Sequence, residues 1–398
     1  MKTFVRRMQA AILLVCGLVS VSCAGPRSRI VPGDSRTDVY LPLLEGRRIA
    51  VFSNHTGMVG DRHLVDLLLE NKVDVTAIFS PEHGFRGKAD AGAGVGDSTD
   101  PDTGVPILSL YGPRGDVRPS ADAMSRFDVL VVDIQDVGLR FYTYYITLCH
   151  LVDVCGESGK EVIILDRPNP NGHYVDGPLL DMRLKSGVGH LPVPVVHGLT
   201  LAELIGMAQG EGWLSEAGNR CRVTPVLCKD YTHGTPCEIP IAPSPNLPNL
   251  QAIYLYPSLC PFEGTVVSLG RGTDKPFQQY GHPALEGRYS YHFTPESRPG
   301  AQNPPLKGKV CYGVDLSALP DARNIGLDLS YVIDAYSILR EKGEEKDFFA
   351  PFFDRLMGVT WVREMIEQGC TADEIRQRWM PEVEQFKSLR KKYLLYAE

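Results

Sequence analysis

Short apolar runs alternate with helical stretches through the first half of this chain, and that alternation constrains the fold more than any other feature. The run FDVLVVDI (127–134) is continuously apolar through its centre, which is typical of a strand covered on both faces of a sheet. Helical stretches such as HLVDLLLENK separate it from similar runs, which are RRIAVFSN (47–54), VDVTAIFS (73–80) and EVIILD (161–166). This βαβα order predicts an α/β fold with a parallel sheet and right-handed crossovers.

The pattern changes near residue 239, which predicts a second domain. The segment IPIAPSPNLPNL begins at Ile239 and carries four prolines, and the end of the chain has the periodicity of helices. A length of 398 residues also exceeds that of a typical single domain. We therefore predict an α/β domain over 38–238 and a smaller, mixed α+β domain over 239–398.

The first 22 residues are typical of a signal peptide rather than of a folded segment. Lys2, Arg6 and Arg7 precede the apolar stretch AAILLVCGLVSVS, which is too short to span a membrane. The following Cys23, with Ala and Gly after it, resembles the lipidation site of a bacterial lipoprotein. Residues 23–37 would then be a lipidated N-terminus with a flexible tether. The predicted location is the cell envelope, with a membrane partner through the lipid anchor; plain cleavage to a periplasmic protein is the alternative.

The net charge argues against nucleic acid as a partner, and the cysteine spacing argues against a zinc site. Removal of residues 1–22 takes away three positive charges and changes the formal net charge from −7 to −10. No basic cluster offsets this charge, so nucleic acid is not an expected partner. The ten cysteines include no C-x-x-C pair and fit no zinc pattern, and they predict no particular disulfide.

Polar side chains collect where the predicted strands end. In an open parallel sheet these carboxyl ends form the rim at which ligands bind. The candidates are Asn54, His55, Glu82, His83, Arg86, Asp133, Gln135, Asp136, Arg140, Tyr142, Asp166, Arg167, Asn169 and His197. Each has a structural alternative: the aspartates can cap helices, the arginines can neutralise them, and the tyrosine can pack a helix on the sheet. Together they predict an active-site crevice.

Several reaction classes can be compared with this set of residues. A dinucleotide site needs G-x-G-x-x-G directly after the first strand, and a serine hydrolase of the common kind needs G-x-S-x-G; neither occurs there. A metal site from His55, His83, Asp133 and His197 has no supporting spacing, and we predict neither metal nor cofactor. Glycoside hydrolysis needs two carboxyl groups and polar groups that bind sugar hydroxyls. Glu82 with Asp133 or Asp136 would meet that need.

Long motifs in the chain resemble the NamZ-type exo-β-N-acetylmuramidases. They include SPEHGFRG, DVLVVDIQDVGLRFYTY, LDRPNPNG, VPVVHGLTLAEL, APSPNLPNL, EGTVVSLGRGTDKPFQQYG and RKKYLLY. The resemblance implies a Rossmann-like larger domain, a smaller C-terminal domain and a cleft between them. It also implies release of N-acetylmuramic acid from the non-reducing end of peptidoglycan fragments in cell-wall turnover, without a cofactor.

The same resemblance assigns residue roles. Glu82 would be the catalytic acid, and Asp133 and Asp136 are the acids of the DIQDVG motif. Asn246, Glu263 and Arg271 lie in further motifs and are expected to bind substrate. The stretch SGVG (186–189) departs from the family's SFVG, and Gly187 lacks the phenylalanine side chain that the family would place near the cleft.

Three hypotheses follow for the whole chain. In the first it is an exo-acting muramidase in which Glu82 protonates the leaving oxygen and Asp133 or Asp136 is the base or stabilises the transition state. Arg271 or Arg140 would bind the lactyl carboxylate of the substrate. In the second it is a non-catalytic glycan-binding or muropeptide-binding lipoprotein, and in the third a metal-dependent hydrolase. The separation of the two carboxyl groups would set the stereochemical outcome, with roughly 5–5.5 Å for retention and about 6.5–9.5 Å for inversion.

Overall fold

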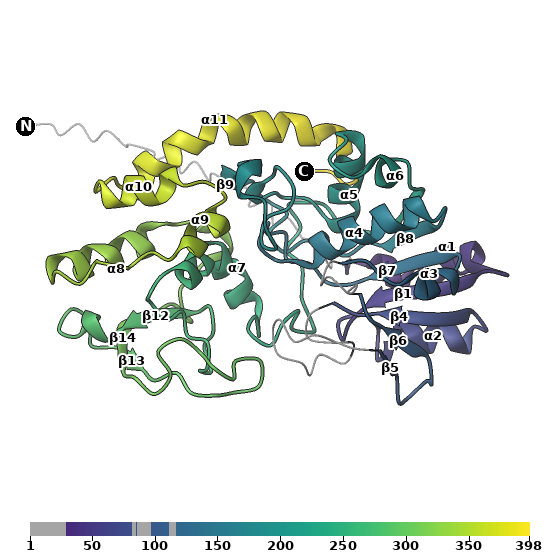
Figure 1. The fold of residues 1–398 in the computed structure, drawn as a ribbon, viewed down its shortest axis with the longest axis horizontal. Helices are drawn as coiled ribbons and strands as arrows, with labels where there is room; N and C mark the ends of the chain where they lie inside the picture. Colours follow the sequence, from purple (N-terminus) through teal and green to yellow (C-terminus); the bar gives the residue numbers. More distant parts are fainter. Residues whose placement is uncertain (1–28, 82–84, 86–96, 111–116) are drawn as a thin grey trace, which may run out of the picture.

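A computed structural model of the chain describes residues 29–81, 85, 97–110 and 117–398. Cys23, Glu82, His83 and Arg86 lie outside the described residues, as does the predicted signal peptide. Figure 1 shows two parts side by side, an α/β part and a C-terminal part, with helix α11 (Ala372–Arg390) running along one side of both.

The α/β part is built on a sheet that has seven strands within the described residues, in the order β11-β8-β7-β1-β4-β6-β5. Neighbouring strands are parallel except β5 and β6 at one edge. The strands are β1 (Arg48–Ser53), β4 (Asp74–Phe79), β5 (Ser98–Thr99), β6 (Pro106–Leu108), β7 (Val129–Asp133), β8 (Glu161–Leu165) and β11 (Val223–Val226). The predicted α/β class is therefore confirmed.

Helices cover both faces of the sheet. Ile49 and Val51 of β1 face the core shared with α1 (Thr37–Leu44) and α2 (Leu64–Glu70), while Ala50 and Phe52 face the core on the other side. This alternation follows from the two-residue period of a strand. The second core is covered by α3 (Ala121–Ser125), α4 (Tyr144–Glu157) and α5 (Leu201–Gly210), with α6 (Glu216–Asn219) packed on α4. Because both faces are buried, the strands appear in the sequence as apolar runs.

The strand order reverses at β1. From β1 the chain continues to β4 and β6 on one side and then to β7, β8 and β11 on the other. Apart from β5, this is the 3-2-1-4-5-6 order of a Rossmann-type sheet. Ligands of such sheets bind beyond the carboxyl ends of the strands at the reversal. Here that point, which we call the switch point, lies between the ends of β1 and β7.

The C-terminal part combines helices with a small antiparallel sheet, which confirms the predicted α+β character. Its elements are α7 (Leu250–Leu259), β12 (Gln279–His282), β13 (His292–Phe293), β14 (Cys311–Asp315), α8 (Ser330–Glu341), α9 (Pro351–Met357), α10 (Trp361–Glu367) and α11. Two further antiparallel strand pairs are present: β2 (Met58–Val59) with β3 (Arg62–His63), and β9 (Asp176–Leu179) with β10 (Pro194–Val196). No helix in the described ranges is long and apolar enough to cross a bilayer.

The segment 31–36 is bound to the sheet. Val31 forms an antiparallel bridge with Lys229, and the Gly33 amide donates to the Asp166 carbonyl at 2.8 Å. A β-carbon on Gly33 would lie 2.3 Å from the Val226 carbonyl oxygen, so only glycine allows this close approach. The folded α/β part therefore begins before residue 38, within the stretch that the sequence predicted to be a tether.

Candidate active site

Hydrogen bonds join the loops after β1 and β7 at the switch point. Asn54 Oδ1 accepts from the Thr56 amide at 2.9 Å and from the Thr56 hydroxyl at 2.7 Å. The Thr56 hydroxyl oxygen in turn accepts from the Gln135 amide at 3.1 Å, and Asn54 Nδ2 donates to the Tyr144 hydroxyl at 3.1 Å. Asn54 is fully buried, so it fixes the shape of the rim from within.

Asp133, the last residue of β7, forms a buried ion pair with Arg167, which follows β8. Arg167 Nε donates to Asp133 Oδ1 at 2.7 Å, and its Nη2 donates to Asp34 Oδ2 at 2.6 Å. Burial and the nearby Asp133 charge raise the pKa of Asp34 to about 6, although Arg167 opposes the shift. One guanidinium therefore holds two buried carboxylates from distant parts of the chain.

Asp34 is a site residue that the sequence did not indicate. It lies in a Pro- and Gly-containing stretch without periodicity, and nothing in PGDS distinguishes it from an ordinary loop acid. Only the structure, in which segment 31–36 binds to the sheet, brings Asp34 to the site.

The second oxygen of Asp133 faces the loop after β1. Asp133 Oδ2 is buried and has no hydrogen-bond partner in the part of the chain that the structure describes. A β-carbon on Gly57 would lie 3.0 Å from this oxygen and 2.1 Å from the Ser53 hydroxyl oxygen. Because Gly57 has no side chain, the Ser53 hydroxyl and the Asp133 carboxylate can pack closely against it.

Asp136 is the acid nearest the surface in the DIQDVG stretch, although it is only 8% exposed. Its Oδ1 accepts from the Gly138 amide at 2.7 Å, and its Oδ2 has no partner among the described residues. Burial raises the pKa of Asp136 to about 7. Near neutral pH the group is thus divided between its acid and base forms. Gln135 Nε2 fixes the adjoining backbone by donating to the carbonyls of Asp136 and Pro168 at 2.8 and 2.9 Å.

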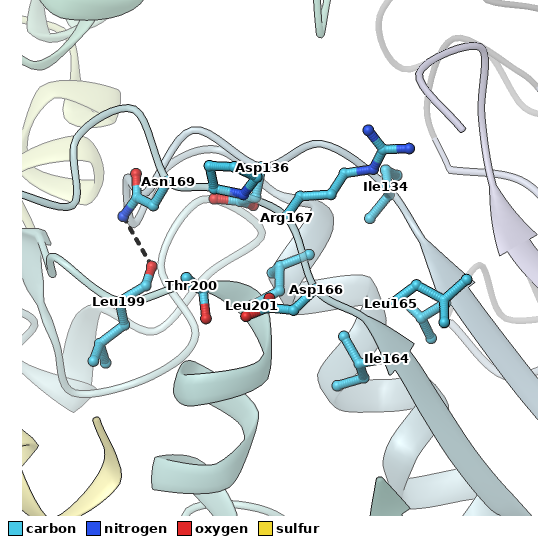
Figure 2. A pocket seen from close by; sticks show the side chains of 12 residues that line it. Ile134, Asp136, Ile164, Leu165, Asp166, Arg167, Asn169, Leu199, Thr200 and Leu201 are labelled. Atoms are coloured by element: carbon cyan, nitrogen blue, oxygen red, sulfur yellow. Dashed lines mark hydrogen bonds between the residues drawn. The ribbon is translucent and has the colours of Figure 1, made fainter. Parts of the chain in front are cut away.

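Figure 2 shows a small pocket between the ends of β7 and β8 and the start of α5, lined by Asp136, Asp166, Arg167, Asn169 and Thr200 among others. Its volume of about 10 Å³ suits one water molecule and not a sugar ring. Asp166 accepts from the Ala202 amide at 3.2 Å and from the Tyr396 hydroxyl at 2.7 Å, so it anchors α5 and the end of the chain. Asn169 donates to the Leu199 carbonyl at 2.9 Å, as the figure shows. Both side chains shape the loops here.

Arg140 points into the interior and not toward the predicted crevice. It is fully buried, and it donates to the carbonyls of Pro178, Val193 and Leu356 at 2.7, 2.9 and 3.0 Å. Burial lowers its pKa to about 10. The contact with Leu356, in α9, shows that Arg140 joins the two parts of the molecule.

His197 is buried as well. Its Nδ1 accepts from the Leu199 amide at 3.2 Å, and burial, followed by the charges of Arg390 and Arg140, lowers its pKa to about 3. The imidazole is therefore neutral at physiological pH.

The proline-rich segment after residue 239 lies against the rim. The Tyr142 and Tyr144 hydroxyls donate to the Pro243 carbonyl at 2.9 and 3.2 Å, and His55 Nε2 lies 2.8 Å from the Ala242 carbonyl oxygen. Asn246 Nδ2 donates to the Gly300 carbonyl at 3.0 Å. His55 and Tyr142 thus hold the connection between the two parts of the molecule.

Arg271 and Glu263 form an ion pair in the C-terminal part. Arg271 Nε and Nη2 both lie 2.6 Å from Glu263 Oε1, and the guanidinium lies over the Phe277 ring at 5.1 Å. Phe277 contacts Tyr256, which contacts Tyr142 of the α/β part. The Arg271 side chain keeps 23% of its surface exposed, so it is accessible to a ligand.

Glu82, His83 and Arg86 lie outside the described residues, but neighbours on both sides are described. Ser80 and Pro81 follow β4, which pairs with β1, and the Phe85 ring contacts the His63 ring at 4.6 Å. His63 Nε2 lies 2.9 Å from the Asn54 carbonyl oxygen, so Phe85 is linked to the end of β1. In the described ranges no three His, Cys, Asp or Glu side chains are grouped as a metal site would need.

A Rossmann-type sheet with carboxyl groups at its switch point, and a second domain packed on the rim, defines a two-domain α/β protein with an acidic site. Models of the exo-β-N-acetylmuramidase NamZ family match both parts, the N-terminal model over residues 49–251 and the C-terminal model over 254–396. The chain therefore belongs to the NamZ exo-β-N-acetylmuramidase family, and it is a glycosidase.

Individual relatives agree with this assignment. The peptidoglycan β-N-acetylmuramidase NamZ of Bacillus subtilis (strain 168) is 34% identical over 416 residues, which cover 96% of this chain and 97% of the relative. Two solved DUF1343 family proteins from Bacteroides fragilis NCTC 9343 are 57% and 28% identical, with TM-scores of 0.85 and 0.79. Each alignment covers 93% of this chain and the whole of the other chain.

Proposed function

We propose that this protein is an exo-acting muramidase that releases N-acetylmuramic acid from the non-reducing end of peptidoglycan fragments. The observation that carries the proposal is the relation to the B. subtilis enzyme, which extends over both domains. The carboxyl groups at the switch point supply the chemistry that a glycosidase needs.

The roles of the acids follow from their surroundings. Glu82 is proposed as the general acid, as its motif implies. Asp136 suits the general base, because a pKa of about 7 keeps a large fraction ionised at neutral pH while leaving the carboxylate basic. Asp133 is fully buried and paired with Arg167, so it suits electrostatic stabilisation of a positively charged, oxocarbenium-like transition state.

Arg271 is the proposed partner of the lactyl carboxylate of muramic acid. It is partly exposed, whereas Arg140 is buried and directs its bonds to backbone carbonyls. A guanidinium can bind a carboxylate through two parallel hydrogen bonds. Glu263 would hold Arg271 in place for this contact.

Turnover of a chromogenic muramic acid glycoside tests the function, with products from defined muropeptides identified by mass spectrometry. We expect free N-acetylmuramic acid as a product and a loss of at least about 100-fold in kcat for Glu82→Gln, the scale of general acid catalysis. Glu45→Gln, at an exposed residue, is the matched control. Binding of the glycoside without cleavage by the wild-type protein would instead support the glycan-binding alternative.

The proposed location is the cell envelope, with Cys23 as the lipid anchor and cell-wall turnover as the role. Asp34 follows Cys23 by eleven residues, and an extended chain covers about 3.3–3.6 Å per residue. An anchor at Cys23 would thus hold the rim within about 40 Å of the membrane. Fractionation of cells that express wild-type protein or Cys23→Ser tests this, and equal membrane recovery of both would contradict it.

A further inference from the structure

Segment 31–36 places an acid in the site from outside the sheet. Asp34 is buried, and its Oδ2 accepts from Arg167 Nη2 at 2.6 Å. Its position is fixed on several sides: the Gly33 amide donates to the Asp166 carbonyl at 2.8 Å, and the Tyr40 hydroxyl donates to the Asp34 carbonyl at 3.0 Å. A solvated tether would need none of these contacts.

Asp34 restrains Asp133 indirectly, through the Arg167 side chain that contacts both. Its Nε binds Asp133 Oδ1 while its Nη2 binds Asp34, so two edges of one rigid, planar group are held at once. Without Asp34 the guanidinium would be fixed at one edge only. The Asp133 carboxylate would then lose the restraint that keeps Oδ2 directed toward the loop after β1.

The orientation of Asp133 Oδ2 indicates why such a restraint would matter for catalysis. The oxygen is buried, lacks a hydrogen-bond partner among the described residues, and lies against Gly57 in the loop after β1. A buried carboxylate oxygen without a donor is costly unless another role compensates for it. Here it places negative charge at the switch point, where positive charge would develop on the sugar in the transition state.

We propose that Asp34 is a positioning residue of the glycosidase, which acts through Arg167 to hold Asp133 in the orientation that the transition state requires. The inference rests on the proposed function and adds to it a residue from the segment that follows the predicted anchor. Because Asp34 affects charge stabilisation in the transition state, its loss lowers kcat and leaves KM nearly unchanged.

The test is a kinetic double-mutant cycle on the full chain with the muramic acid glycoside. We expect Asp34→Asn to lower kcat by about ten- to a hundredfold, as small displacements of reacting groups do. In an Asp133→Asn background the same substitution should have no further effect, because its route to the site is already gone. Asp38→Asn, an exposed acid four residues along, should retain wild-type kcat.

Tyr40→Phe distinguishes an effect of Asp34 on catalysis from a general effect of segment 31–36 on stability. It removes one hydrogen bond to the Asp34 backbone but keeps both the Gly33–Asp166 backbone hydrogen bond and the contact of Asp34 with Arg167. The variant should therefore lower thermal stability and leave kcat unchanged. If Asp34→Asn does not fold, Asp34→Glu keeps the charge but displaces it, and the same fall in kcat is expected.

Wild-type kcat in the Asp34 variant would overturn the inference while the proposed function stands. Independent, multiplying losses in the double variant would overturn it as well. Absence of turnover by the wild-type protein would overturn the proposed function, and this inference with it.

Discussion

The Tyr396 hydroxyl donates a 2.7 Å hydrogen bond to Asp166 Oδ2 and so connects the end of the chain to the end of β8. The Cys228 amide donates to the same hydroxyl at 2.9 Å, and the Leu395 amide donates to Glu203 Oε1 at 2.8 Å. Figure 1 shows the C-terminus beside α5, in the α/β part. The last residues therefore fasten the C-terminal part onto the rim, and Asp166 immediately precedes Arg167.

Tyr396→Phe should destabilise the protein by about 1–3 kcal/mol, because it leaves a buried carboxylate oxygen and a buried amide without their partner. Urea unfolding followed by circular dichroism measures the change. Tyr393→Phe is the control: it removes a hydrogen bond to Glu211 at a less buried site, and its loss should be smaller. Equal losses for the two variants would contradict the role given to Asp166.

The sequence predicted most of the sheet but only part of the site. The runs 47–54, 73–80, 127–134 and 161–166 correspond to β1, β4, β7 and β8 to within two residues, because a doubly covered strand must be apolar along its length. Thr200 with Glu203 and Thr371 with Glu374 have the sequence spacing of a capping box, and both boxes are present in the structure.

Two site features could not be found from local pattern. Arg140 follows a strand end, as the other candidate site residues do. The Leu356 carbonyl in α9, 216 residues further along the chain, helps to direct its side chain into the interior. Asp34 lies in an aperiodic segment, and its role depends on an arginine 133 residues further along. Both depend on long-range packing, which no short window of sequence encodes.

Stability should fall as the pH rises from about 5 to 7. Burial raises the pKa of Asp136 and of Asp166 to about 7, from an ordinary value of 3.8. Between these values the native state holds protons that the unfolded state has released, so each group lowers the unfolding free energy by about 1.4 kcal/mol per pH unit. Above pH 7 both states are ionised and this loss ends.

Urea unfolding at several pH values checks the effect, with Asp166→Asn as the variant. The amide does not titrate, so the slope of unfolding free energy against pH should become shallower by about 1.4 kcal/mol per unit. Asp38→Asn should keep the wild-type slope, because this residue is exposed. An unchanged slope in Asp166→Asn would show that Asp166 is ionised in the native protein throughout this range.

Arg271→Ala should raise KM for a muramic acid glycoside by about tenfold, which is the loss of one charge-assisted contact. KM for the matching N-acetylglucosamine glycoside, which lacks the lactyl carboxylate, should change little. Steady-state kinetics on the two substrates gives the comparison. Arg288→Ala removes an exposed positive charge from the same domain and serves as the control. An equal rise for both substrates would assign Arg271 a structural role through Glu263 and Phe277.

The cysteines should behave as thiols whose reactivity is set by burial. All eight that the structure describes are free; Cys370 is partly exposed, and the other seven are buried. Burial raises the pKa of Cys149 and Cys155, which keeps them in the unreactive thiol form. Cys370→Ser should therefore remove one fast-reacting thiol from the native protein in an Ellman assay, whereas Cys149→Ser should leave the fast phase intact. A reducing agent should not change the melting temperature, and a fall on reduction would reveal a disulfide that contributes to stability.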